Sequence, residues 1–152
     1  MSVVDSVFLA VSGGPQEVSD WLVEGVGAEA MTAGAEEVRL RARGATGEGW
    51  FGVVVQPNGY VEPDPAPDEV QAMDRYAIEV QVRGGSDDAL HREAGRLFDT
   101  LIAGHSDLPA LLVHNLDTLV SAYLPGAGKH TFDPQITPDV EDIDTWRPWV
   151  VG

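Results

Sequence analysis

Apolar and polar residues alternate most clearly between residues 76 and 83. Every second position there is apolar, namely Tyr76, Ile78, Val80 and Val82. A period of two is typical of a strand with one face in a core and the other toward water. The pattern therefore predicts a strand over 76–83 with Glu79 on its solvent face.

A helix is predicted directly after this strand. Ser86 is a favourable N-cap, and two acidic residues follow it where the helix dipole favours negative charge. Apolar residues then recur at spacings of three and four: Leu90, Ala94, Leu97, Phe98, Leu101 and Ile102. Gly104 stands at the position of a left-handed C-terminal cap. We expect His91, between these positions, to face solvent.

Beyond the helix, turn residues separate two short apolar runs, 111–113 and 119–124. This arrangement predicts two short strands joined by a turn. A helix over 116–123 is the alternative that the pattern leaves open.

The chain before residue 76 is predicted to form a strand, a helix and a β-hairpin. The apolar run over 3–11 is typical of a central strand, and a helix is expected from Pro15 to Val26. Residues 28–36, which are small and acidic, are expected to form a loop. Alternation over 37–43 and 50–56 predicts the hairpin.

This order of elements predicts one α+β domain over residues 1–132, with an antiparallel sheet of five to six strands and two helices on one face. The layout resembles a ferredoxin-like or related two-layer sandwich, a likeness of fold that carries no function. Residues 61–74 are expected to be a proline-rich acidic surface loop. Residues 133–152 are expected to be an acidic tail that docks on the domain or on a partner through its tryptophans.

Composition narrows the classes of protein to consider. The chain has 152 residues, 43% of them hydrophobic, which suffices for one globular core. It has no cysteine, so disulfides, thiolate nucleophiles and cysteine-ligated metals are excluded. No apolar run approaches the roughly 18 residues of a membrane span, and the first residues lack the features of a signal peptide. We therefore expect a cytoplasmic protein.

The net charge of the chain limits the classes of binding partner that we expect. Twenty-five acidic and nine basic residues give a formal charge of −16, which disfavours binding to nucleic acid or to an anionic membrane. Such acidity maintains solubility, and it also favours binding to a basic protein.

The leading functional hypothesis is a protein-binding protein, such as an inhibitor or immunity-type partner of a basic protein, with homodimerisation as an open alternative. The residues expected to contact the partner are acidic loop residues and tail tryptophans: Glu62, Asp64, Asp68, Glu69, Trp146 and Trp149.

A second set of residues supports a different hypothesis. Arg39, Arg41 and Arg43 share one face of one strand. They either pair with carboxylates such as Glu79 or those of the tail, or form an anion-binding patch. With Trp50, Tyr76 and His114 they would line a pocket in a small-molecule-binding protein or small enzyme, either between helices and sheet or at a dimer seam. A third alternative is a structural subunit of a larger assembly that docks through an unpaired edge strand and the C-terminal tail.

No catalytic set, metal site or cofactor is predicted. The four histidines show no spacing that would place two of them on one metal. His114, Asp117 and Ser121 include the residue types of a catalytic triad, but turn capping by Asp117 and partial burial of His114 explain them. Residues 126–131 do not fit the phosphate-binding loop pattern and are expected to form a flexible loop.

Overall fold

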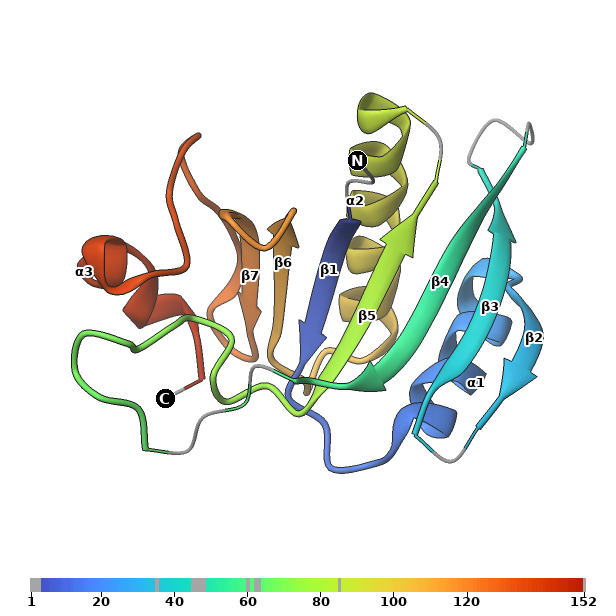
Figure 1. Cartoon of the computed structure of the whole chain (residues 1–152), viewed down its shortest axis with the longest axis horizontal. Coiled ribbons are helices and arrows are strands. Elements are labelled where there is room, and N and C mark those ends of the chain that lie inside the picture. Colours follow the sequence, from blue (N-terminus) through green and yellow to red (C-terminus); the bar gives the residue numbers. More distant parts are fainter. Residues whose placement is uncertain are drawn as a thin grey trace.

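The computed structural model describes residues 4–34, 36–44, 49–59, 61, 64–84 and 86–151. Eight strands form one antiparallel sheet in the order β2-β3-β4-β5-β1-β6-β7-β8 (Figure 1). The strands are β1 (Val4–Leu9), β2 (Glu29–Ala33), β3 (Val38–Arg43), β4 (Trp50–Pro57), β5 (Ile78–Arg83), β6 (Ala110–His114), β7 (Thr118–Leu124) and β8 (Gly128–Thr131). The α+β class and the antiparallel sheet are confirmed, but the predicted five to six strands are too few.

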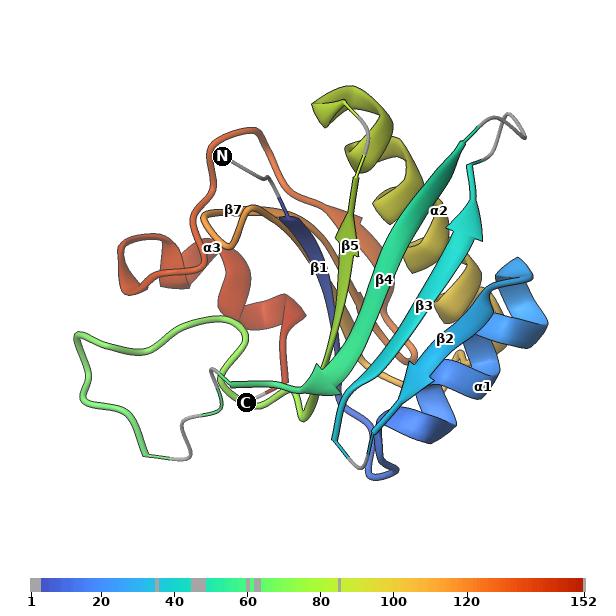
Figure 2. The ribbon, with the colours of Figure 1, turned by 45° about the vertical axis from the view of Figure 1, so that its right-hand side comes forward.

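Two long helices, α1 (Pro15–Val26) and α2 (Asp87–Gly104), cover one face of the sheet (Figure 2). Ser86 caps α2, because its Oγ accepts a hydrogen bond from the Ala89 amide at 3.2 Å. The predicted cap at Gly104 is wrong: the helix includes Gly104, and His105 follows it with a φ of −137°. A short helix near the C-terminus, α3 (Ile143–Trp146), is a third helix that the sequence pattern did not predict.

The first core lies between these two helices and the sheet. Apolar side chains of α1 and α2 pack on alternate residues of the central strands, including Val7, Leu9, Val53, Val80 and Val82. The predicted central strand, the two helices and the β3–β4 hairpin are all present. No helix of the described ranges has the length and apolar character needed to cross a bilayer.

Two segments predicted as loops are strands. β2 pairs with β3 through an irregular register between Ala30 and Thr32, and β8 pairs with β7 from Gly128 to Thr131. Both are outermost strands. An edge strand takes its conformation from one neighbour and is exposed over much of its length, so it needs no apolar alternation of its own.

The connection between β6 and β7 resolves the alternative left open for residues 116–123. They include most of strand β7, so a helix there is wrong. Asn115 and Leu116 turn the chain with positive φ angles of 51° and 59°. The Asn115 amide also donates to the Val4 carbonyl at 2.8 Å, which ties the end of β6 to the start of β1.

A second core lies on the opposite face of the sheet. It joins Phe8 of β1 and strands β6 and β7 to Tyr76 and to the C-terminal segment, residues 134–151. In this core Trp146 is only 2% exposed, and its Nε1 donates to the Asp139 carbonyl at 2.9 Å. Tyr76, predicted to share the core of Ile78, instead precedes β5 and packs here, where burial raises the pKa of its hydroxyl.

Glu79 departs from the predicted pattern, because it is 1% exposed instead of facing water. Its carboxylate accepts hydrogen bonds from Ser6 Oγ at 2.8 Å, Gln56 Nε2 at 3.1 Å and Gln81 Nε2 at 3.3 Å. Two donors on the neighbouring strands β1 and β4 and one on β5 itself supply the partners that a buried carboxylate requires. Glu79 is therefore part of the packed sheet, and within the described residues Arg39 and Arg41 of β3 pair with other carboxylates.

Replacing Trp146 with Ala should lower the free energy of unfolding by about 3–5 kcal/mol, the cost of deleting a large buried aromatic side chain. Trp50→Ala is the matched control, because Trp50 is 40% exposed and its removal should cost about 1 kcal/mol or less. Urea unfolding followed by circular dichroism measures both values. Equal losses would show that the C-terminal segment is not packed on the sheet in solution.

Candidate functional site

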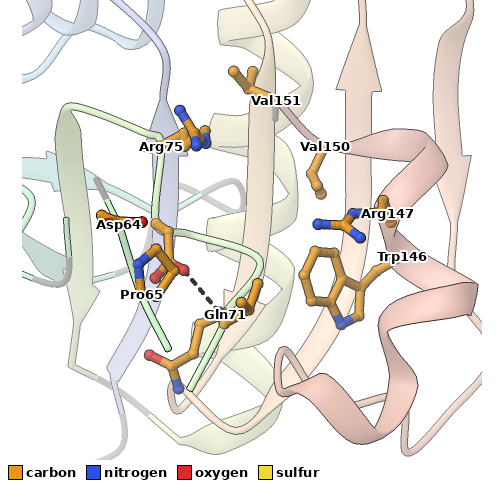
Figure 3. Close-up of a pocket in the computed structure, with 10 residues that line it drawn as sticks. Asp64, Pro65, Gln71, Arg75, Trp146, Arg147, Val150 and Val151 are labelled. Atoms are coloured by element: carbon orange, nitrogen blue, oxygen red, sulfur yellow. Dashed lines mark hydrogen bonds between the residues drawn. The ribbon is translucent and has the colours of Figure 1, made fainter. Parts of the chain in front are cut away.

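A cavity of about 630 Å³ lies between the loop that precedes β5 and the C-terminal segment (Figure 3). Its volume is within the range of small-molecule sites and of pockets that receive a partner's side chain. The lining combines apolar and charged side chains, including Asp64, Val70, Arg75, Trp146, Arg147 and Val150. The cavity therefore lies on the side of the sheet away from α1 and α2, not in the predicted place between helices and sheet.

Hydrogen bonds hold the walls of this cavity in place. Asp74 Oδ2 accepts from the Gln71 amide at 2.9 Å, the contact drawn in Figure 3. Asn58 Nδ2 donates to the carbonyls of Met73 at 2.9 Å and Tyr76 at 2.7 Å. The loop is thereby fixed to the end of β4, which makes its surface a preorganised one.

Two arginines contribute positive charge to the cavity. Figure 3 shows Arg147 beside Trp146, with Arg75 on another side of the cavity. Neither guanidinium forms an ion pair with a carboxylate within the described residues. The cavity therefore offers two cationic groups and two carboxylates, those of Asp64 and Asp74, beside an apolar surface. The guanidinium groups are the part of the lining that suits an anionic group of a ligand.

A second hollow of about 360 Å³ is lined by acidic residues instead of by charges of both signs. Four carboxylate residues line it: Asp68, Glu69, Asp139 and Glu141. Gln71 also contributes to its wall and donates from Nε2 to Asp139 Oδ1 at 2.8 Å. This bond, and one of 2.8 Å from the Ala72 amide to the Pro138 carbonyl, join two acidic segments that are far apart in the sequence.

The predicted partner-binding residues fall in different environments. Asp64 lines the larger cavity, whereas Asp68 and Glu69 line the acidic hollow, and all three are exposed. Glu62 lies outside the described residues. Trp146 is buried in the second core, and Trp149 stacks on His130 with ring centroids 4.1 Å apart.

The three arginines of β3 lie on the exposed side of the sheet. Arg39 Nε is 3.0 Å from Glu37 Oε2, and Arg41 Nε is 3.6 Å from Glu29 Oε2. The guanidinium groups of Arg41 and Arg43 lie 4.3 Å and 4.5 Å from the Trp50 ring centre. Arg39 and Arg41 therefore do pair with carboxylates, but with those of Glu37 and Glu29 instead of Glu79.

The six residues expected to share one pocket are not brought together. The arginines and Trp50 lie on β3 and β4, Tyr76 lies in the second core, and His114 lies beside Asp5 at the end of β6. His114, Asp117 and Ser121 do not form a catalytic triad among the described residues. Asp117 accepts a hydrogen bond from Thr118 Oγ1 at 3.0 Å, as a turn residue does. Ser121 is buried, and no hydrogen bond joins it to His114 in the described part of the chain.

Asp5, His91 and His114 form a cluster that no motif in the sequence indicates, and His91, which was expected to face solvent, contacts buried Asp5 instead. His91 Nδ1 lies 2.6 Å and His114 Nε2 lies 3.4 Å from the same carboxylate oxygen, Asp5 Oδ2. The two imidazole rings stack with centroids 3.8 Å apart. Two signals in the sequence could have indicated it. Asp5 interrupts an apolar run, and His91 lies three residues before Ala94 and seven before Phe98, on the buried stripe of α2.

The electrostatics of this cluster favour a neutral His114. Desolvation lowers the pKa of its imidazole most, the Asp5 carboxylate opposes this shift, and His91 adds to it. Asp5 is fully buried, and its Oδ1 has no hydrogen-bond partner among the described residues. A buried carboxylate with one unpaired oxygen is costly, so this position calls for an explanation.

Comparison of the chain with protein-family models, with curated proteins and with solved structures finds no match. Function must therefore be inferred from the geometry and charge of these sites.

Replacing His91 with Ala should lower the free energy of unfolding by about 1–3 kcal/mol, because it removes the closest partner of a buried carboxylate. The matched control is Arg92→Ala at the next position of α2, an exposed site where a change within about 0.5 kcal/mol is expected. Chemical unfolding in the presence of EDTA measures both. A His91 variant as stable as the control would mean that the Asp5 contact contributes nothing to stability.

Proposed function

We propose that this chain is a non-enzymatic cytoplasmic protein that binds a basic protein partner, in the manner of an inhibitor or immunity protein. The observation that carries the proposal is the acidic hollow, where carboxylates of two distant segments line one concave surface.

The position of these carboxylates supports recognition of a cationic surface. Asp68 and Glu69 come from the loop, and Asp139 and Glu141 come from the C-terminal segment. Because Gln71 bridges the two segments, the carboxylates are held near one another before a partner arrives. Such preorganisation reduces the entropy lost on binding.

The charge of the whole chain supports the same partner class. A net charge of −16 raises the rate of encounter with a basic protein and disfavours acidic competitors. The neighbouring cavity adds apolar surface from Val70, Val150 and Val151. A side chain of the partner that entered this cavity would gain hydrophobic contact beside the electrostatic one.

We further infer that the core elements follow a ferredoxin-like arrangement. β1, α1, β4, β5, α2 and β6 alternate along the chain as in that fold, and their strands lie in the order β6-β1-β5-β4. The pairs β2–β3 and β7–β8 extend the two edges. This arrangement carries no function of its own.

Reversing charge at the hollow with Glu69→Lys and Glu141→Lys should weaken partner binding by about 100-fold, because like charges brought together at an interface cost several kcal/mol. The partner is first isolated with tagged wild-type chain from its own host at low and moderate salt. Affinity of the purified pair is then measured by surface plasmon resonance.

The matched control is Glu24→Lys with Glu36→Lys, which changes net charge equally at exposed positions away from the hollow. Its affinity should stay within a few-fold of wild type. If both double variants lose affinity equally, the hollow is not the contact surface. Recovery of the chain alone at both salt concentrations would contradict the proposal as a whole.

The larger cavity favours a second candidate function, the binding of a small anionic molecule. Arg75 and Arg147 contribute two guanidinium groups, Asp64 and Asp74 contribute two carboxylates, and Val70 and Val150 contribute apolar surface beside them. Planar guanidinium groups suit carboxylate and phosphate oxygens, and an apolar surface suits the remainder of an organic ligand.

An anion bound in this cavity should raise the melting temperature by about 5–10 °C when present at about 100 times its Kd. The probes are inorganic phosphate, citrate and AMP, measured by differential scanning fluorimetry. Arg147→Ala should abolish the rise, whereas Arg92→Ala on α2, away from the cavity, should preserve it. A rise of equal size in both variants would place the binding elsewhere.

A further inference from the structure

The Asp5–His91–His114 cluster brings three metal-ligating side chains together from separate elements. Asp5 belongs to β1, His91 to α2 and His114 to β6. One ligand atom from each residue lies within 4.8 Å of the other two. Two imidazoles and one carboxylate form the protein ligand set of many zinc sites that keep a position open for water.

The scaffold of the cluster is rigid. Asp5 and His114 are direct partners in the pairing of β1 with β6, which fixes the separation of their backbones. Helix α2 packs on both strands and places His91 above them. The start of β1, the end of β6 and the start of α2 all lie at one end of the strands, at the top of Figure 1. Sites built on such elements hold their ligands more accurately than sites on loops.

The distances between the ligand atoms are close to those of a metal site, but the imidazole rings are stacked with only 14° between their planes. At least one ring would have to rotate so that both nitrogen lone pairs point at one ion. Bonds of about 2.0–2.2 Å in a tetrahedral zinc site place neighbouring ligand atoms roughly 3.3 Å apart. The His114 Nε2–Asp5 Oδ2 distance of 3.4 Å already has this value. The His91 Nδ1–Asp5 Oδ2 distance of 2.6 Å would have to open by about 0.7 Å, a shift within reach of side-chain torsions.

The carboxylate of the cluster is buried and the two imidazoles are partly exposed, a combination that suits a metal ion. Asp5 is fully buried with Oδ1 unpaired among the described residues, whereas the His91 and His114 side chains are 34% and 25% exposed. A cation would supply the missing charge partner of the carboxylate. The exposed side of the imidazoles would admit the ion and leave room for a water ligand.

We propose that Asp5, His91 and His114 bind one divalent transition-metal ion of the zinc class, with water completing its coordination. Imidazole nitrogens favour Zn²⁺, Co²⁺ and Ni²⁺, whereas Mg²⁺ and Ca²⁺ favour sites made of oxygen ligands alone. The site lies on the helix face of the sheet, away from the acidic hollow, so it does not depend on the proposed protein-binding function.

The first test titrates the EDTA-treated 152-residue chain with Zn²⁺ by isothermal calorimetry. One ion should bind per chain, and His91→Ala and His114→Ala should each weaken binding by more than about 100-fold, beyond the roughly 10–100-fold that a supporting residue costs. His105→Ala is the matched control, because His105 stacks on Trp21 at the other end of α2 and should leave the affinity unchanged.

A second measurement keeps the test decisive if either variant fails to fold. Co²⁺ added to wild-type chain should give the visible absorption of a four-coordinate ion, and its paramagnetism should broaden amide signals around Asp5, His91 and His114 first. Zn²⁺ should displace the Co²⁺, and excess Mg²⁺ should not.

Three outcomes would overturn the proposal. The first is no Zn²⁺ binding by the folded chain. The second is unchanged affinity in both folded histidine variants, which would show adventitious binding to surface carboxylates. The third is Co²⁺ broadening centred on the acidic hollow of Asp68, Glu69, Asp139 and Glu141 instead of on β1.

Discussion

The burial of β1 on both faces is the constraint on which the rest of the structure depends. Val7 and Leu9 point into the core beneath the helices, whereas Phe8 belongs to the second core. A strand with apolar residues on both sides needs a covering layer on each. The two long helices supply one layer, and the loop before β5 together with the C-terminal segment supplies the other. Both hollows lined by charged residues arise in that second layer.

Local patterning predicted the elements that form the first core, because each of them carries its own apolar period. It failed where a neighbour decides the conformation. β2 and β8 are strands since β3 and β7 offer hydrogen-bonding partners, which no window of residues around 29–33 or 128–131 reveals. Glu79 has the sequence position of a solvent-facing residue, but donors from β1, β4 and its own strand allow it to be buried.

The candidate sites depend even more strongly on contacts between residues that are distant in the sequence. Acidic segments were recognisable by composition, yet their approach depends on Gln71 reaching Asp139 across the fold. Asp5, His91 and His114 have no mutual spacing that a motif could describe, since the pairing of β1 with β6 and the packing of α2 create the cluster. Sequence supplied only an acidic residue in an apolar strand and a histidine on the buried stripe of a helix.

The edge strand β2 could pair with another copy of the chain at high protein concentration. β2 leaves backbone groups available for pairing with another chain, and Met31 on it is 63% exposed. The irregular register near Ala30 and the shared negative charge of the molecules both oppose such pairing at neutral pH. The sequence isoelectric point is about 4.3, so acidification removes the repulsion and leaves the irregular register as the remaining barrier to edge-to-edge polymerisation.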